Sequence, residues 1–171
     1  EEIMTVALTN EPAVTKVDLP AVSRAITPPP LEGATPVPVV FTLPPQEAGH
    51  SEFRINGVPF WKAKPFLAKL GETQYWTVKN DTDWDHPFHL HGYFFMVVDE
   101  KGAPLQPMVW KDTVNIPMKT TARLLVTFDE LPGTWMIHCH ILDHAEGGLM
   151  GTVHVGPGPA TEHTHPVPKK P

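Results

Sequence analysis

A cysteine flanked by two histidines lies in the segment GTWMIHCHILDHAEGGLMG, residues 133–151. Cys139 is the only cysteine of the chain, so it cannot close an intrachain disulfide. His138 and His140 adjoin it, and His144 follows five residues after it. A thiolate with nearby imidazoles is a soft donor set that suits copper. This segment is therefore the first candidate for a metal site.

A second histidine-rich segment, DHPFHLHG, covers residues 85–92. His89 and His91 share a face if this segment is extended, because side chains alternate along a strand. We expect Pro87 to interrupt regular strand pairing and so to let His86 point elsewhere. The two segments together supply seven candidate ligands.

The residues before Cys139 predict a strand that would separate two kinds of ligand. Residues 134–137 are β-branched, aromatic or apolar, and they follow a Pro-Gly turn signal. On such a strand Cys139 points to one face, and His138 and His140 point to the other. One tripeptide could therefore serve two metal sites on opposite sides of a single strand.

One consistent assembly has two metal sites. The first is a trigonal His₂Cys site of the blue-copper type, made of His86, Cys139 and His144. The second lies on the opposite face as half of a polynuclear site, and its ligands are His89, His91, His138 and His140. A closed tetrahedral zinc site would explain four ligands but not seven. Buried structural cysteines and scattered surface histidines would not gather in two such compact motifs.

These segments, with WKDTVNIPMKTTARLLVTFD between them, resemble the copper-ligand motifs of the multicopper oxidases. The resemblance is to the C-terminal cupredoxin domain of the laccase-like members and covers roughly residues 51–156. The ligands that it implies are His86, Cys139 and His144 for type 1 copper, His89 for type 2 copper, and His91, His138 and His140 for the type 3 pair.

The resemblance also implies a reaction and a partner. Laccase-like oxidases take electrons from phenols, aromatic amines or metal ions at type 1 copper and reduce O₂ to water at a trinuclear copper cluster. That cluster needs four more histidines than this chain places in the two motifs, and they normally come from another cupredoxin domain. We therefore expect a second domain or chain, in an oligomer or a two-chain enzyme. A periplasmic or extracellular location is implied in the same way.

Further site residues follow from position. The family has a methionine or a non-coordinating residue ten positions after the cysteine; here this is Leu149, with Met150 next to it. We expect Leu149 to occupy the axial position without binding copper.

Glu146 in the copper loop and Asp112 in a KDTV phrase are candidate proton donors to O₂. The alternative is that these two carboxylates are solvated or structural groups.

Short strands with turn signals between them predict an all-β fold, and the resemblance makes it a cupredoxin-like Greek-key β-sandwich or barrel. The strands are expected at residues 37–43, 53–55, 74–80, 93–98, 110–116, 122–128, 134–140 and 149–155. An Asn-Gly turn should follow residue 55. No amphipathic helix of three turns is expected.

The 21 prolines concentrate outside the two motifs and suggest three regions. We expect a proline-rich linker or arm at 1–36, the copper-binding cupredoxin domain at 37–156, and a flexible tail at 157–171. His163 and His165 form an HxH motif in the tail, but no strand pattern surrounds them, and His50 and His154 have no assigned role. Because Glu1 is not a natural start, we expect a processed form of a longer protein.

Charge and composition narrow the function classes. The net charge of −6 gives no basic footprint for nucleic acid, and no apolar run approaches the ~20 residues of a membrane span.

Two other copper functions stay open. An electron-transfer cupredoxin would leave four histidines without a use. A nitrite-reductase-like enzyme usually lacks the histidine directly after the cysteine, which here is His140.

Overall fold

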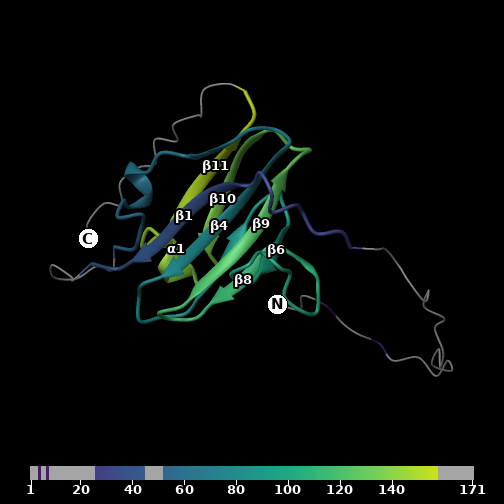
Figure 1. The fold of residues 1–171 in the computed structure, drawn as a ribbon. Coiled ribbons are helices and arrows are strands. Elements are labelled where there is room, and N and C mark those ends of the chain that lie inside the picture. The colour runs from purple at the N-terminus through teal and green to yellow at the C-terminus, as the bar shows by residue number, and fades with distance from the viewer. Residues whose placement is uncertain (1–3, 5–6, 8–25, 45–51, 158–171) are drawn as a thin grey trace.

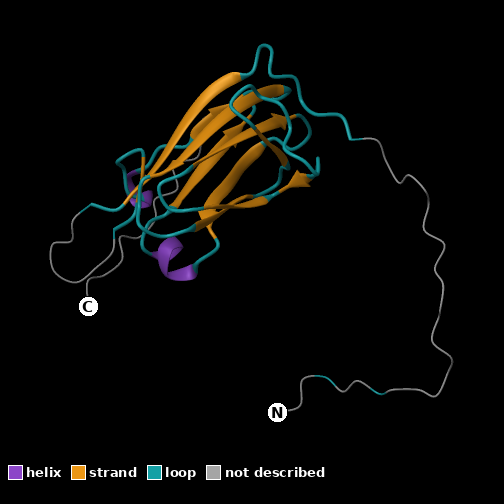
Figure 2. Ribbon diagram, turned by 60° about the horizontal axis from the view of Figure 1, so that its bottom comes forward, coloured by secondary structure: helices purple, strands orange, loops and turns teal. Residues whose placement is uncertain are grey.

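The structure, a computed structural model, describes Met4, Ala7, residues 26–44 and residues 52–157. Within these residues, eleven strands form two sheets that pack face to face (Figures 1 and 2). Most of the predicted arm, His50, and the tail with His163 and His165 lie outside the described residues.

The first sheet has the strand order β2-β1-β4-β9-β6-β7, and the second has the order β3-β11-β10-β5-β8. The strands of the first sheet are β1 (Thr35–Thr42), β2 (Arg54–Ile55), β4 (Glu72–Asn80), β6 (Phe95–Val98), β7 (Trp110–Lys111) and β9 (Thr121–Phe128). Those of the second are β3 (Phe66–Ala68), β5 (His86–Leu90), β8 (Thr113–Ile116), β10 (Gly133–Cys139) and β11 (Met150–Val155).

Helical structure is limited to one 3₁₀ turn, η1 (Phe60–Lys62), and one short helix, α1 (Leu142–Glu146), among the described residues. Figure 1 shows α1 at one end of the strands. The all-β prediction is confirmed. No helix in the described part of the chain is long and apolar enough to cross a membrane.

A continuous apolar core joins the two sheets. Its centre is aromatic: Trp76 of β4, Phe88 of β5 and Phe95 of β6 are each at most 1% exposed. The ring of Phe88 lies 6.3 Å from those of both Trp76 and Phe95, measured between centroids. Because Phe88 belongs to the second sheet and its two neighbours to the first, this side chain ties the histidine-bearing strand to the opposite layer.

The chain crosses from one sheet to the other at Asp112. The prediction of a single strand over residues 110–116 is wrong, because β7 pairs with β6 in the first sheet whereas β8 pairs with β5 in the second. The strand-like sequence runs through the crossing without a turn signal, so the pattern gave no sign of it. The crossing brings Asp112 next to β5, where its carbonyl accepts a hydrogen bond from the Leu90 N–H.

Some predicted boundaries also shift. β1 begins at Thr35, two residues before the predicted start, because its parallel pairing with β4 extends that far. β6 begins at Phe95, two residues after the predicted start at Tyr93. Tyr93 lies outside the strand, and its hydroxyl donates to the Leu131 carbonyl. β3 was not predicted. The Asn56–Gly57 turn is confirmed, with φ of 52° and 76°.

We expect the substitution Phe88→Ala to destabilise the fold by about 3–5 kcal/mol, because it removes the ring that connects both sheets and leaves a cavity. The measurement is the free energy of unfolding in urea. Phe94→Ala is the matched control: that ring is 61% exposed, so its loss should cost about 0.5 kcal/mol or less. Equal losses in the two variants would contradict this description of the core.

Candidate metal centre

β10 divides the candidate ligands between its two faces. Cys139 is 3% exposed and belongs to the core. His138 and His140 lie on the outer face, where their rings stack with a centroid distance of 5.2 Å and an interplanar angle of 18°. His138 pairs with His89 of β5 on one side and with Met150 of β11 on the other, which fixes the register of the strand. The side-chain alternation expected from the sequence is therefore present.

β5 sorts its histidines in the same way. His86 is buried in the core and His89 faces outward, because residues three apart on a strand lie on opposite faces. The prediction that Pro87 interrupts the pairing is wrong. Pro87 pairs with Asn115 inside a regular strand, and its carbonyl accepts a hydrogen bond from the His140 N–H at 2.8 Å. Plain alternation, without a distortion at the proline, aims His86 inward.

The inner cluster consists of His86, Cys139 and His144. The two Nδ1 atoms lie 3.1 Å apart, and each is 3.7 Å from the Cys139 Sγ. Nitrogen donors about 2.0 Å and a sulfur donor about 2.3 Å from a shared centre are roughly 3.5–3.7 Å apart in a trigonal set. The three atoms therefore stand close to where the ligands of one ion would stand. One thiol and two imidazoles are also the donor types that fit copper.

The turn that follows β10 carries His144 to the thiol. Ile141 directs its backbone N–H at the Cys139 Sγ at 3.4 Å and leads into α1. Behind α1, Gly148 has a φ of +105°, and a Cβ there would lie 2.7 Å from the Phe53 carbonyl oxygen. Only glycine fits this close approach. The Phe53 ring then packs against that of His144, with centroids 4.7 Å apart.

Leu149, not Met150, belongs to the inner side of the sheet. Leu149 is 1% exposed, lies in the same core as Cys139, and accepts the Cys139 N–H at its carbonyl at 3.1 Å. Met150 pairs directly with His138, and residues directly opposite each other on paired strands share a face. The thioether of Met150 is therefore on the outer side.

Burial governs protonation in the inner cluster. His86 is 0% exposed, and burial, reinforced by the neighbouring His144, lowers its pKa to about 4. Burial also lowers the pKa of His144 and raises that of the Cys139 thiol. Without a cation, both imidazoles are neutral and the thiol keeps its proton. A bound metal ion would reverse the preference of the thiol, because a coordinating thiol is deprotonated outright.

A buried polar pair, Asn80 and Thr82, lies behind His86. The Nε2 of His86 is 2.7 Å from the Thr82 Oγ1, and this hydroxyl is 2.8 Å from the Asn80 Oδ1. No sequence pattern predicted a role for these two residues. The one signal available was a short polar step, Asn-Asp-Thr, that begins at the last residue of β4 and precedes the histidine segment.

The outer cluster consists of His89, His91, His138 and His140. The ligand atoms of His89, His138 and His140 lie within 4.8 Å of one another. The Nε2 atoms of His91 and His138 are 2.9 Å apart. His140 is exposed, and the other three rings are partly buried. Four imidazoles therefore converge on a surface that remains open to solvent.

Backbone carbonyls hold two of these rings. The Nδ1 of His89 lies 2.9 Å from the Asp112 carbonyl oxygen and 3.0 Å from the Thr113 Oγ1. The Nδ1 of His138 lies 2.9 Å from the Cys139 carbonyl oxygen. A carbonyl only accepts, so each Nδ1 carries the proton. Each Nε2 is then left with a lone pair for a metal ion.

The two candidate proton donors have different surroundings. The exposed carboxylate of Asp112 acts on His140, where it opposes the lowering of the histidine pKa by burial and by the neighbouring imidazoles. Glu146 is the last residue of α1, exposed, in the turn that carries His144. No hydrogen bond or ion pair joins Glu146 to either cluster within the described residues. Of the two candidate proton donors, Asp112 is therefore the better placed, because it lies beside the outer cluster.

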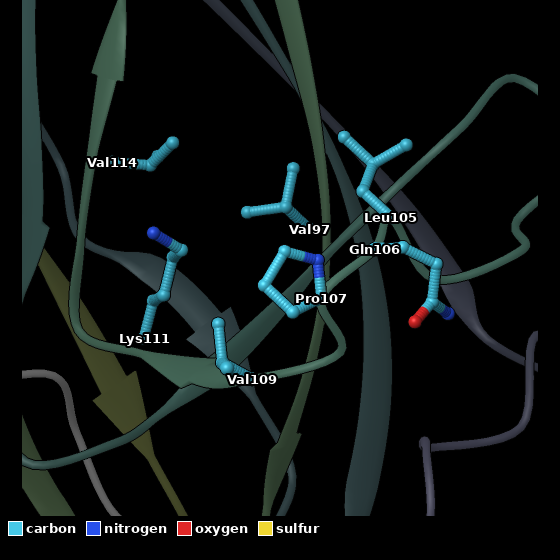
Figure 3. Close-up of a pocket in the computed structure, with 7 residues that line it drawn as sticks. All are labelled: Val97, Leu105, Gln106, Pro107, Val109, Lys111 and Val114. Atoms are coloured by element: carbon cyan, nitrogen blue, oxygen red, sulfur yellow. The ribbon is translucent and has the colours of Figure 1, made fainter.

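A cavity of about 280 Å³ opens elsewhere, between β6, β8 and the loop before β7 (Figure 3). Its walls are mainly aliphatic, with Lys111 at one side. None of the candidate ligands lines it. The candidate metal centre is therefore a pair of side-chain clusters and not this cavity.

Comparison with known proteins identifies the family. The family model of the multicopper oxidases matches residues 33–159. The chain belongs to the multicopper oxidase family. Copper resistance protein A of Escherichia coli is 42% identical over 110 residues, which are 63% of this chain and 18% of that protein. The multicopper oxidase mco of Staphylococcus epidermidis is 35% identical over 116 residues, 64% of this chain and 26% of that protein.

Solved structures confirm the cupredoxin-like fold of this multicopper oxidase chain. McoA of Aquifex aeolicus superposes with a TM-score of 0.66 at 27% identity, over 78% of this chain and 32% of that one. The metallo-oxidase of Campylobacter jejuni gives 0.65 at 28% identity, also over 78% and 32%. Proteins of this family carry copper as their cofactor. The chain spans 18% and 26% of the two curated relatives named above.

We expect copper to raise the melting temperature of this multicopper oxidase chain, because an ion that binds only the folded state stabilises it by mass action, by about 2.7 kcal/mol at one hundred times its Kd. The measurement is thermal unfolding with copper and with a chelator. His144→Ala should lose most of the shift. His154→Ala, which removes a histidine bonded to Thr134 on β10, is the control and should keep it. A shift that survives His144→Ala would place the copper elsewhere.

Proposed function

We propose that the sandwich from Thr35 to residue 156 forms the C-terminal cupredoxin domain of a laccase-like multicopper oxidase, with the residues before Thr35 as a linker and 157–171 as a tail. One observation carries the proposal. Cys139 belongs to the donor cluster on one face of β10. Its two direct neighbours in sequence, His138 and His140, belong to the donor cluster on the opposite face. A cupredoxin with a single metal site has no need of this arrangement.

In this proposal the inner cluster is the type 1 site and the outer cluster is half of a trinuclear site. The assigned ligands are His86, Cys139 and His144 for type 1 copper, His89 for type 2 copper, and His91, His138 and His140 for the type 3 pair. Copper ions held there would supply one-electron transfer at the first site and the reduction of O₂ to water at the second.

In this proposal, different residues exclude water, admit electrons, carry them between the clusters and supply protons. His86, Phe53 and the surrounding core keep water from the buried side of the inner cluster. His144 is only partly buried, so electrons from a small reducing substrate would enter at its side. Phenols, aromatic amines and metal ions are the candidate substrates. Peptide bonds connect Cys139 to His138 and His140, which gives a covalent route between the clusters. Asp112 would supply protons beside His140, with Glu146 as a second candidate donor.

The outer cluster requires a partner. Half of the histidines of a trinuclear site would come from this chain, and another cupredoxin domain or chain would supply four more. The partly exposed outer face of β5 and β10 is where that partner would dock, in an oligomer or a two-chain enzyme. We infer a periplasmic or extracellular location from the laccase-like resemblance, and cell fractionation would test it.

Two other copper functions make different demands. An electron-transfer cupredoxin would use the inner cluster alone, and a nitrite-reductase-like enzyme would place a single ion at the outer one. Four converging imidazoles favour the oxidase: three have ligand atoms within 4.8 Å of one another, and the fourth, His91, has its Nε2 2.9 Å from that of His138. Counting copper ions in the assembled protein, and recording the absorption of a type 3 pair, separates the three functions.

The substitutions Cys139→Ser and His138→Ala should damage different signals. Cys139→Ser should remove the intense thiolate-to-copper absorption together with substrate oxidation, because no other thiol is present. His138→Ala should keep that absorption and lose O₂ reduction, because its side chain faces the other cluster. Absorption spectra and oxygen uptake of the two assembled proteins are the measurements. Equal loss of both signals in His138→Ala would contradict the assignment of the two faces.

Leu149→Met should lower the potential of the type 1 site. A thioether in the axial position favours Cu(II), and the axial ligand is a known control of blue-copper potential. We expect a decrease of about 59 mV or more, which is a tenfold change in a one-electron equilibrium. Redox titration is the measurement, and Met150→Leu on the outer face is the control. If Met150→Leu raises the potential and Leu149→Met leaves it unchanged, the axial assignment is wrong.

A further inference from the structure

We propose that Asn80 and Thr82 are positioning residues that fix the tautomer of His86 and so prepare the inner cluster for copper. The inference rests on the proposed function of that cluster. Asn80, Thr82 and His86 are 0%, 3% and 0% exposed, so water does not compete for their hydrogen bonds. Three polar side chains buried in series need partners of fixed direction.

The amide of Asn80 has one possible orientation. Its Nδ2 donates to the Trp84 carbonyl at 2.7 Å and to the Ile116 carbonyl at 3.0 Å. Both partners are oxygens that only accept, so the NH₂ group must point at them. The Oδ1 therefore points at Thr82, whose backbone N–H donates to it at 3.0 Å.

This orientation determines the direction of the next two bonds. The Thr82 hydroxyl donates its single proton to the Asn80 Oδ1 at 2.8 Å; the Trp84 carbonyl, at 3.2 Å, is a more distant acceptor for the same proton. With the proton so committed, the Thr82 oxygen accepts. The His86 Nε2, 2.7 Å away, must then be the donor. His86 consequently carries its proton on Nε2 and a lone pair on Nδ1.

The lone pair lies where the metal site needs it. Nδ1 is the His86 atom that is 3.1 Å from the His144 Nδ1 and 3.7 Å from the Cys139 Sγ. The opposite tautomer would place a proton inside the cluster and leave two lone pairs facing each other at Thr82. Metal-binding histidines commonly depend on such a partner at the second ring nitrogen.

Packing alone cannot make this choice. The rings of Phe41 and Phe53 lie at 89° and 85° to the His86 ring, with centroids 5.7 Å and 5.5 Å away. These contacts hold the ring in place but do not distinguish one protonated nitrogen from the other. The hydrogen bonds of Asn80 and Thr82 therefore decide the tautomer.

The test compares the chain with Thr82→Val, which keeps the shape of the side chain and removes the hydroxyl. Long-range ¹H–¹⁵N NMR of the metal-free chain should show the Nε2–H tautomer of His86, and Thr82→Val should lose this preference. Copper affinity should fall about 10–100-fold, and the type 1 absorption should change. Thr82→Ser should restore most of both. Thr73→Val, which removes a threonine bond of 2.9 Å to Thr127, is the control and should change neither.

Each result has a definite meaning. An Nδ1–H tautomer of His86 in the unmodified chain would overturn the proposal, and that measurement does not depend on whether a variant folds. Thr82→Val behaving like Thr73→Val in tautomer and affinity would also overturn it. If the tautomer responds as expected but the unmodified chain shows no thiolate-to-copper absorption, the positioning role is supported and the proposed function of the cluster fails.

Discussion

Neighbouring side chains on an extended strand cannot share a face, and β10 turns this constraint into two metal clusters. Pairing with β5 and β11 on either side holds the strand in one register, so Cys139 enters the core while His138 and His140 stay outside. The two histidines within β5 obey the same rule. Core-facing His86 joins the thiol, and outward-facing His89 joins the imidazoles. The separation of the clusters thus comes from strand geometry, and the turn after β10 adds His144 to the inner one.

The inner cluster introduces polar groups into an apolar core, which is unfavourable unless each group has a partner. His86 meets this condition through Thr82, and Thr82 meets it through Asn80. The same network holds the ends of β4 and β8 together, since Asn80 also donates to the Ile116 carbonyl. Stability of the sandwich and preparation of the site therefore depend on the same few hydrogen bonds. The outer cluster is less buried, and backbone carbonyls orient two of its rings, those of His89 and His138.

The sequence predicted the composition of both clusters because the period of a strand is short and regular and the histidines are dense. Cys139 and His138 could be assigned to opposite faces from adjacency alone. The effect of Pro87 was predicted wrongly, because a proline that contributes only its carbonyl fits within a paired strand. The sheet change at Asp112 and the role of Asn80 were missed for another reason. The sheet change depends on pairing with segments distant in sequence, and the bonds of Asn80 to Thr82 and Trp84, although local, matter because these side chains are buried; residue spacing encodes neither.

The pairing of β10 on both edges also makes chain length a stricter requirement than side-chain identity. One residue inserted or deleted within the strand would turn part of it over, moving the thiol outward or its apolar neighbours into water. Substitutions in the same strand change one contact at a time. The exposed segment between β6 and β7 has no such limit. Related domains should therefore differ in length there, while the spacing from Gly133 to Cys139 stays constant through their divergence.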